Sequence, residues 1–368
     1  MGKTYYYTNK HNTQKMKKLF ITAWLALIAV AGQAQIKAEA NEPVELMAIL
    51  ARTAGYPEYN MDLAEQYTRD TEEWFAPYKQ HEAVALAWKL HTTYSIGYEK
   101  VMNMAIHLDI ENGKIKFLGE KSDLSENWKD VDIKDFIKKL NKFYKDTRFH
   151  EFFEQHRAFY QGYISNYELT ETVYFPFNLK WYPRFHYGTE EMEPFKIYIC
   201  FTYGLNNNGE WRKLPGKPRE LFAIMGYAFI PAMGRPKMDF SLLWHEVNHP
   251  YVNPLLDNEG NAKLMEPIGQ KLLELSQEAM KQQAYTNWHI VINESIVRAS
   301  TLIYAQDAGY KPEVLKSLMN IEINSGFPWM PQLVDCLRNY ANNRDKYKTL
   351  NDYYPEIAKC LQKYIDNK

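Results

Sequence analysis

The chain has 368 residues, of which 46% are apolar and 24% charged, a composition typical of globular proteins. Gly and Pro number only 17 each and Cys only three, which excludes collagen and a disulfide framework and argues against general disorder. The formal net charge of -1 gives no reason to expect a nucleic acid as partner.

The N-terminal segment, 1–34, has the pattern of a secretory signal peptide. It holds five lysines and no acid, and its apolar run Leu19–Ala31 is shorter than the about 20 residues that a membrane span needs. A basic start, a short apolar run and a small-residue exit predict cleavage after Ala34. Met16 is a candidate for the natural start, which would make 1–15 an extension. We therefore expect an exported protein, periplasmic or extracellular, with no membrane span in its mature part.

Residues 35–190 are predicted to be mostly helical. Asn41 and Pro43 indicate the start of a helix that stops at Gly55. Five more patterns of helical spacing follow. They are Leu63–Phe75, His81–Thr93, Tyr98–His107, Ile133–Tyr144 and Phe149–Tyr163.

The pattern changes to strands after about residue 190. Phe195–Tyr203 and Leu221–Ile230 are short runs of β-branched and aromatic residues, which are typical of strands. The sequence Asn-Asn-Asn-Gly at Asn206–Gly209 is typical of a turn. Two or more antiparallel strands are therefore expected here.

Helical patterns return in the last third of the chain. They are Asp239–His249, Ala262–Gln283, Trp288–Ala305, Pro312–Met319, Pro331–Ala341 and Tyr353–Asp366. The predicted fold is α+β and helix-rich. Its two parts, 35–190 and 191–368, are not expected to fold independently.

The cysteines permit one disulfide in an oxidising compartment. Cys336 with Cys360 is the favoured pair. Packed free thiols, including Cys200, are the more common alternative.

His245-Glu246-Val247-Asn248-His249 is an H-E-x-x-H motif on a predicted apolar helix. Residues four apart share one helix face, so both imidazoles can bind one divalent ion, and the pattern fits zinc. Glu246 lies about 100° around the helix, where it can hold a water and accept its proton. The composition predicts roughly 0.03 such motifs by chance.

A catalytic zinc needs a third protein ligand, for which Glu294 is the favoured candidate. Glu294 lies among apolar neighbours, where a carboxylate requires a metal or a cation. Arg298 follows one turn later. It is either the partner in a purely structural ion pair or a residue that orients Glu294 as a ligand. The weaker candidates for the third ligand are Glu266, Glu274 and His289.

His245-Glu246-x-x-His249 followed by Asn293-Glu294-x-x-x-Arg298 resembles the gluzincin branch of the HExxH zinc metallopeptidases, over about 240–305. The resemblance implies a zincin-like core with a small antiparallel or mixed sheet beside the metal-binding helix. It also implies Glu294 as the third ligand, and Leu221–Ile230 as an edge strand to which an extended peptide adds. The longer string H-E-V-N-H-P-Y-V-N-P resembles an uncharacterised family of secreted bacterial proteins, of the domain-of-unknown-function type, over most of the mature chain.

Two features depart from the gluzincin pattern. The gap of 45 residues from His249 to Glu294 is longer than in the best-known gluzincins. Pro250 directly follows His249, and a proline disfavours helical geometry in the residue before it. The metal-binding helix is therefore expected to end or kink at His249.

These residues predict a secreted zinc-dependent hydrolase, and a metallopeptidase acting on a peptide or protein is favoured. Zinc bound by His245, His249 and Glu294 would carry a water, and Glu246 would accept its proton. Candidate donors to the oxyanion are Tyr304, His289, Tyr285 and Tyr251. The alternative is a non-catalytic exported binding protein with a vestigial or structural zinc site, and a zinc hydrolase acting on other bonds would use the same residues. The sequence does not determine the substrate or the oligomeric state.

Overall fold

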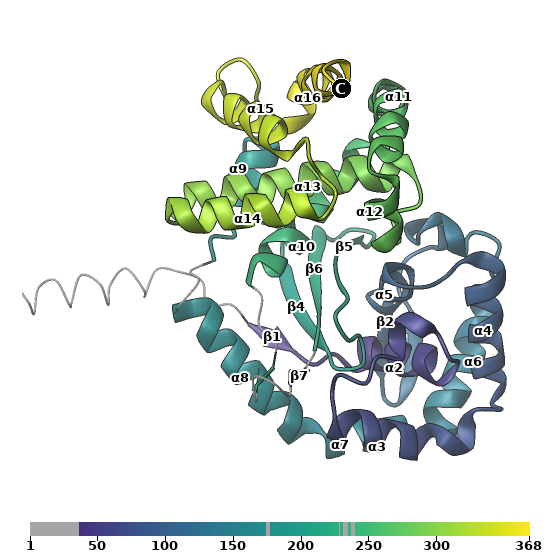
Figure 1. The fold of residues 1–368 in the computed structure, drawn as a ribbon. Coiled ribbons are helices and arrows are strands. Elements are labelled where there is room, and N and C mark those ends of the chain that lie inside the picture. The colour runs from purple at the N-terminus through teal and green to yellow at the C-terminus, as the bar shows by residue number, and fades with distance from the viewer. Residues whose placement is uncertain (1–36, 174–176, 228, 231–234, 237–239) are drawn as a thin grey trace, which may run out of the picture. The chain divides into compact units, whose positions relative to one another are not determined.

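The structure, a computed structural model, describes residues 37–368 except 174–176, 228, 231–234 and 237–239. The predicted signal peptide, 1–34, lies outside the described residues. Lys37–Lys368 forms one compact unit. The α+β, helix-rich class predicted from the sequence is confirmed, because helices surround a small mixed sheet (Figure 1).

Within the described residues, the main sheet has four strands in the order β1-β4-β6-β5. Their bounds are Ala38–Glu39 for β1, Phe195–Cys200 for β4, Asn207–Lys213 for β5 and Arg219–Gly226 for β6. Strands β1 and β6 run parallel to β4, and β5 runs antiparallel to β6. Shorter antiparallel pairs join β2 (Leu108–Glu111) to β3 (Lys114–Phe117) and β7 (Phe229–Ile230) to β8 (Arg235–Pro236).

The strand predictions were right in part. Both predicted strands exist, but β4 and β6 are parallel, and β6 is central, so its prediction as an edge strand was wrong. The whole run Leu221–Met225 is buried, as is typical of a strand covered on both faces. The predicted turn at Asn206–Gly209 was also wrong from Asn207 onward, where β5 begins. The strand at this edge of the sheet is β5 instead. Its polar and charged residues are typical of an edge strand.

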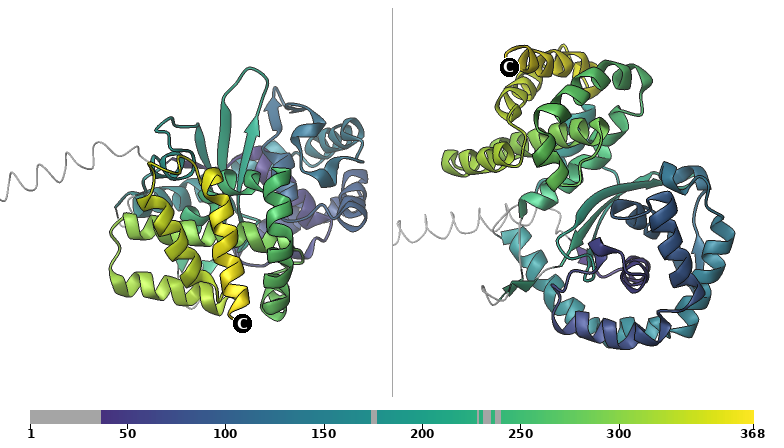
Figure 2. Two further views of the ribbon diagram at one scale, coloured as in Figure 1. Left: turned by 90° about the horizontal axis from the view of Figure 1, so that it is seen from above. Right: turned by 45° about the vertical axis from the view of Figure 1, so that its right-hand side comes forward.

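The first helical layer curves around α2 (Figure 2, right). In α2, the residues from Pro43 to Arg52 are all buried, and the side chain of Asn41 caps its first turn. The helices are α2 (Glu42–Thr53), α3 (Gln66–Phe75), α4 (Glu82–Tyr94), α5 (Glu99–Ala105), α6 (Ile133–Asp146), α7 (Phe149–Gln155) and α8 (Arg157–Val173). The predicted single helix Phe149–Tyr163 is thus interrupted at His156, whose backbone leaves the helical region.

Helix α2 carries a buried carboxyl group, Glu45, which is 0% exposed. The backbone N–H of Phe201, just after β4, donates to it, and so does the Tyr67 hydroxyl at 3.1 Å. Burial raises the pKa of Glu45 to about 7, against these hydrogen bonds. Glu45 therefore connects the first helical layer to the end of β4.

The second helical layer packs on the opposite side of α10, which lies between the sheet and α13 (Figure 1). Helix α13 is apolar on most of its surface and is buried along nearly its whole length. The helices are α9 (Trp181–Tyr187), α10 (Phe240–Val252), α11 (Glu259–Leu275), α12 (Gln277–Gln282), α13 (Trp288–Asp307), α14 (Pro312–Asn324), α15 (Met330–Asn342) and α16 (Leu350–Asp366).

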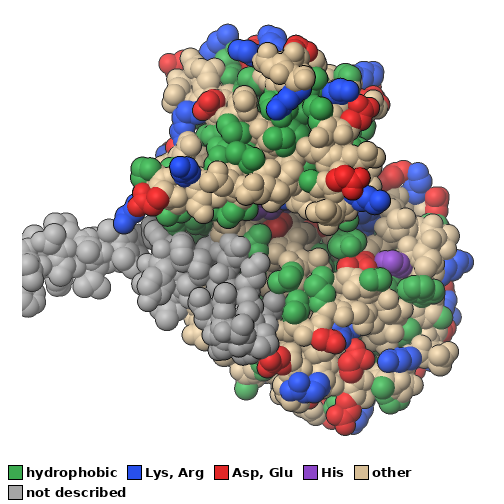
Figure 3. Space-filling model, in the orientation of Figure 1, with side chains coloured by type: hydrophobic (Ala, Val, Ile, Leu, Met, Phe, Trp, Pro, Cys, Tyr) green, Lys and Arg blue, Asp and Glu red, His purple; other side chains and the backbone are tan. Residues whose placement is uncertain are grey.

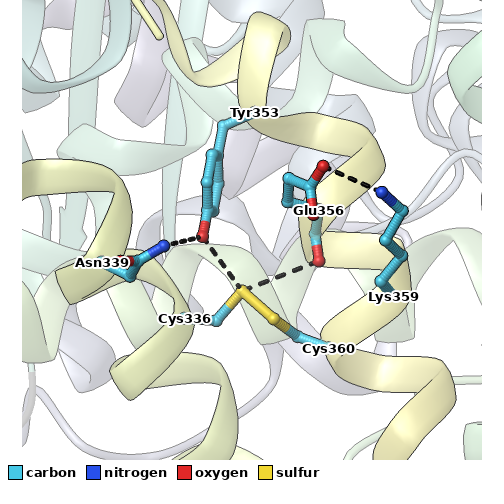
Figure 4. Close-up of a disulfide and its surroundings, with 6 residues drawn as sticks. All are labelled: Cys336, Asn339, Tyr353, Glu356, Lys359 and Cys360. Atoms are coloured by element: carbon cyan, nitrogen blue, oxygen red, sulfur yellow. Dashed lines mark hydrogen bonds and ion pairs between the residues drawn. A yellow bond between two sulfur atoms is a disulfide. The ribbon is translucent and has the colours of Figure 1, made fainter. Parts of the chain in front are cut away.

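A disulfide links Cys336 of α15 to Cys360 of α16 (Figure 4). The sulfur of Cys336 also contacts the hydroxyl of Tyr353, which accepts a hydrogen bond from Asn339. Cys200 is a buried free thiol. The favoured pairing is therefore the one formed, and the alternative of three free thiols was wrong.

Charged side chains of both signs are interspersed over the face seen in Figure 3. Apolar side chains also reach this surface between them. Among the described residues, none of the helices combines the length and apolarity of a bilayer-crossing segment.

Candidate metal centre

The H-E-x-x-H motif lies on α10, beside the edge strand β5. Leu243, Trp244 and Val247 are buried and anchor the helix, which places His245 and His249 on an adjacent face one turn apart. Ligand atoms of His245, Glu246 and His249 lie within 4.8 Å of one another.

Glu294 of α13 reaches both imidazoles. The Nε2 atoms of His245 and His249 are 3.1 Å apart. The carboxylate oxygens of Glu294 lie 3.6 Å from Nε2 of His245 and 3.5 Å from Nε2 of His249. Donors about 2.1 Å from a tetrahedral zinc are about 3.4 Å from each other. The spacing of these three donors therefore fits one zinc ion.

Glu246 lies against the same three side chains. Its Oε2 atom is 3.7 Å from Nε2 of His249 and has no hydrogen-bond partner among the described residues. The side chain of Glu246 is only 6% exposed, whereas those of His245 and His249 are 14% and 13% exposed. A buried carboxyl oxygen without a partner is costly. A cation, or a water held by one, would satisfy it.

The orientation of His249 is set by Asn253, which follows it by one helical turn. Nδ1 of His249 donates to Oδ1 of Asn253 at 3.2 Å. This hydrogen bond places the proton on Nδ1 and leaves the lone pair of Nε2 facing Glu294. Asn253 was not predicted as a site residue, although its spacing in the H-P-Y-V-N string was visible in the sequence.

Asn248, the second variable residue of the motif, fixes the opposite face of α10. Its Oδ1 accepts from Nε2 of His186 at 2.8 Å, and its Nδ2 donates to the Thr301 hydroxyl at 3.2 Å. Thr301 belongs to α13, so this contact joins the two helices that carry the candidate ligands. Burial lowers the pKa of His186 to about 3, so it is neutral at pH 7.

Burial and neighbouring charges set the protonation states of His245 and Glu294. Burial lowers the pKa of His245 to about 3, against the attraction of Glu294, so its imidazole is neutral. Burial disfavours the ionised form of Glu294, but His245 and Arg298 outweigh it and lower the pKa to about 2. Because His245 is neutral at pH 7, Arg298 is the charge that keeps Glu294 ionised.

Burial raises the pKa of Glu246 well above its ordinary range, and the negative charge of Glu294 adds to this effect. A hydrogen bond from the backbone N–H of Gly209 acts in the opposite direction. Without a cation, the charge of Glu294 therefore disfavours the ionised form of Glu246.

Arg298 does not neutralise this group of acids by itself. Its Nε donates to Glu294 at 3.1 Å, and its Nη1 donates to Glu322 of α14 at 2.6 Å. One guanidinium is therefore shared between two carboxylates, the buried Glu294 and the partly buried Glu322, and Glu246 adds a further buried carboxyl group. The purely structural reading, a closed Glu294–Arg298 pair, leaves the Oε2 atom of the buried Glu246 without a partner among the described residues. A divalent cation would supply one.

Strand β5 lies unusually close to α10 because of Gly209 and Pro250. Pro250 has no N–H, so the carbonyl of Glu246 lacks its usual helical donor. A Cβ atom at position 209 would lie 1.8 Å from this carbonyl oxygen. Only glycine allows the approach, and a Cα hydrogen of Gly209 then faces the carbonyl.

The helix does not end at His249, because α10 continues to Val252 with Pro250 inside it. The single hydrogen bond lost at Pro250 leaves only the Glu246 carbonyl without its donor, and β5 covers that carbonyl. In addition, Nη1 of Arg219 donates to the carbonyl of Pro250 at 3.1 Å.

The weaker candidates for the third ligand are placed elsewhere. Glu266 and Glu274 are exposed on α11, where they contact Gln270 and Lys271. His289 is exposed at the start of α13.

Of the four candidate oxyanion donors, Tyr285 contacts the site. Its hydroxyl is hydrogen-bonded to Glu294 and accepts from Nη2 of Arg298 at 3.0 Å. The ring of Tyr304 packs against Trp244 on another side of α10. The ring of Tyr251 stacks on His186. His289 is exposed at the start of α13, as the second residue of that helix.

Residues 233–360 match a family described as a domain of unknown function (DUF4932). The match agrees with the resemblance to an uncharacterised family, but it covers about a third of the chain rather than most of its mature part. It contains α10, α13 and all four candidate site residues. No curated protein and no solved structure matches the chain.

Proposed function

We propose that the protein is a zinc-dependent hydrolase, and specifically a metallopeptidase. One observation carries the proposal: the Nε2 atoms of His245 and His249 and the carboxylate of Glu294 lie 3.1–3.6 Å from one another, and the buried Glu246 lies beside them. Three protein ligands leave the fourth position of a catalytic zinc open for water, and Glu246 lies where a general base would act on that water.

His245 offers the Nε2 atom of a neutral imidazole, His249 offers a second Nε2 atom, and Glu294 offers a carboxylate that Arg298 keeps ionised. A zinc ion held by these residues would supply a Lewis acid that lowers the pKa of water, and its charge would favour the ionised form of Glu246. Glu246 then accepts a proton from the water that attacks the amide carbonyl. It donates this proton to the leaving nitrogen as the C–N bond breaks.

The peptide would lie along β5, the edge strand closest to Glu246. Gly209 on this strand donates its N–H to Glu246. A substrate peptide that paired with the edge of β5 next to Gly209 would therefore run beside the general base. An extended peptide adds to such an edge through backbone hydrogen bonds. This assigns to β5 the role that the sequence had suggested for Leu221–Ile230.

Action outside the cytoplasm is part of the proposal. The disulfide between Cys336 and Cys360 supports it, because disulfides persist in oxidising compartments. The signal-peptide pattern of 1–34 supports it independently.

The first prediction concerns Glu246→Gln. This change removes the general base but keeps the three ligands, so we expect one zinc per chain and a loss of peptide hydrolysis of about 10²- to 10⁴-fold. Elemental analysis and digestion of a fluorogenic peptide library, with and without a chelator, measure both quantities.

The matched control is Glu266→Gln, which removes an exposed carboxylate of α11 and should change neither quantity. Unchanged cleavage by Glu246→Gln would show that the general base is wrongly assigned. Zinc in the wild-type protein with no cleavage of any peptide would favour the alternative, a non-catalytic binding protein.

A further inference from the structure

Arg298 joins three segments of the chain at the candidate metal centre. Besides its bond to Glu294, its guanidinium bonds Glu322 of α14 and the hydroxyl of Tyr285, which precedes α13. The guanidinium carbon also lies 4.6 Å from the ring centroid of Phe327. These four contacts fix the position of the guanidinium group.

Helix α14 is held less firmly than its neighbours. None of its residues is fully buried. Leu315, Met319 and Glu322 are spaced by four and three residues, so they share one helix face, and all three are partly buried. Glu322 is thus a charged residue on the inward face of an amphipathic helix, and Arg298 is its partner.

The charge of Arg298 has two opposite effects on a metal at this site. It keeps Glu294 ionised, which a ligand requires, but it also competes with the metal for that carboxylate and repels a cation. Glu322 offsets the repulsion, because it neutralises the far side of the guanidinium at 2.6 Å while Nε still bonds Glu294.

We propose that Glu322 is a positioning residue of the metal centre, which raises zinc affinity by holding and neutralising Arg298. The inference rests on the proposed zinc site and adds a residue from α14 to it. A Glu322 that served only the packing of α14 would affect stability but not zinc affinity.

The experiment measures zinc dissociation constants by competition with a chromophoric chelator. For Glu322→Gln we expect binding weaker by about tenfold, as for other residues that orient metal ligands. The matched control is Glu274→Gln, which removes an equal charge from the exposed face of α11 and should leave the constant unchanged. Glu322→Asp keeps the charge and should retain most of the affinity. Circular dichroism checks the fold of each variant.

A double-mutant cycle tests the route through Arg298. If Glu322 acts through the guanidinium, its replacement should have little further effect in an Arg298→Gln background. A tenfold loss that persists in that background would overturn the proposed route.

The outcomes separate this inference from the proposed function. Failure of the wild-type protein to bind zinc would overturn both. Zinc binding by the wild type with an unchanged constant in Glu322→Gln would overturn this inference alone. If Glu322→Gln does not fold, Glu322→Ala, which also removes the charge, takes its place with the same expected tenfold loss, and an unchanged constant there would overturn this inference.

Discussion

At the scale of single residues, Glu45 shows how a buried acid makes stability depend on pH. Its carboxyl group lies between α2 and the end of β4, and its pKa rises from 4.5 to about 7 in the folded protein. Between these values the folded state holds a proton that the unfolded state has lost. The contribution of Glu45 to stability is therefore full below pH 4.5 and is lost as the pH rises through 7.

We predict that Glu45→Gln weakens this pH dependence. Wild-type stability should fall by up to about 3 kcal/mol more than that of the variant between pH 4.5 and 8. Urea denaturation of both proteins at several pH values measures the difference. Glu259→Gln, a change on the exposed start of α11, should behave as wild type. Equal pH slopes for wild type and Glu45→Gln would contradict the assignment.

The residues of the candidate centre could be predicted to different degrees. His245, Glu246 and His249 form a short motif, and the apolar neighbours of Glu294 singled it out. The structure brings all four together. Glu322 could not be predicted, because a single acid on an amphipathic helix is indistinguishable from a solvated one until α14 packs on α13. Tyr285 was named as one of four candidate oxyanion donors, but in a sequence with 28 tyrosines nothing ranked it above the others.

At the scale of elements, the contact between β5 and α10 depends on Gly209. A methyl group there would overlap the carbonyl oxygen of Glu246. We predict that Gly209→Ala destabilises the fold by about 2–3 kcal/mol and weakens zinc binding, as measured by urea denaturation and metal competition.

The control for this prediction is Gly162→Ala. Gly162 lies on α8 with nothing within 4 Å of an added Cβ, so the change should be neutral or stabilise by up to about 1 kcal/mol. Wild-type stability of Gly209→Ala would mean that β5 does not lie this close to α10.

Helices were easier to predict than strands in this chain. The spacing of apolar residues indicates a helix locally, and α2, α6 and α13 begin within a few residues of their predicted starts. The order of strands is not a local property. The polar sequence of β5 resembles a loop until α10 and β6 supply its partners, which is why it was missed.

At the scale of the whole molecule, the two helical layers depend on one sheet. β1 pairs with β4, and Glu45 of α2 takes a hydrogen bond from Phe201. The N-terminal part, 35–190, therefore contacts residues beyond its predicted boundary, at β4 and at Phe201.

We predict that the fragment 37–190 does not fold cooperatively. It lacks β4 and β6, so β1 and the apolar face of α2 would remain uncovered. Thermal denaturation followed by circular dichroism should show a sharp transition for 37–368 and a gradual one for the fragment. A sharp transition in the fragment would show that the first layer is an independent domain.

The pairing of β1 with β4 has a consequence for the time at which the protein folds. Ala38 and Ile197 are about 160 residues apart, and such non-local contacts slow folding. During synthesis the central strand β6 emerges after both of its neighbours, so the sheet stays incomplete until Gly226 is available. The newly made chain therefore keeps an incomplete sheet until more than half of its residues have been synthesised.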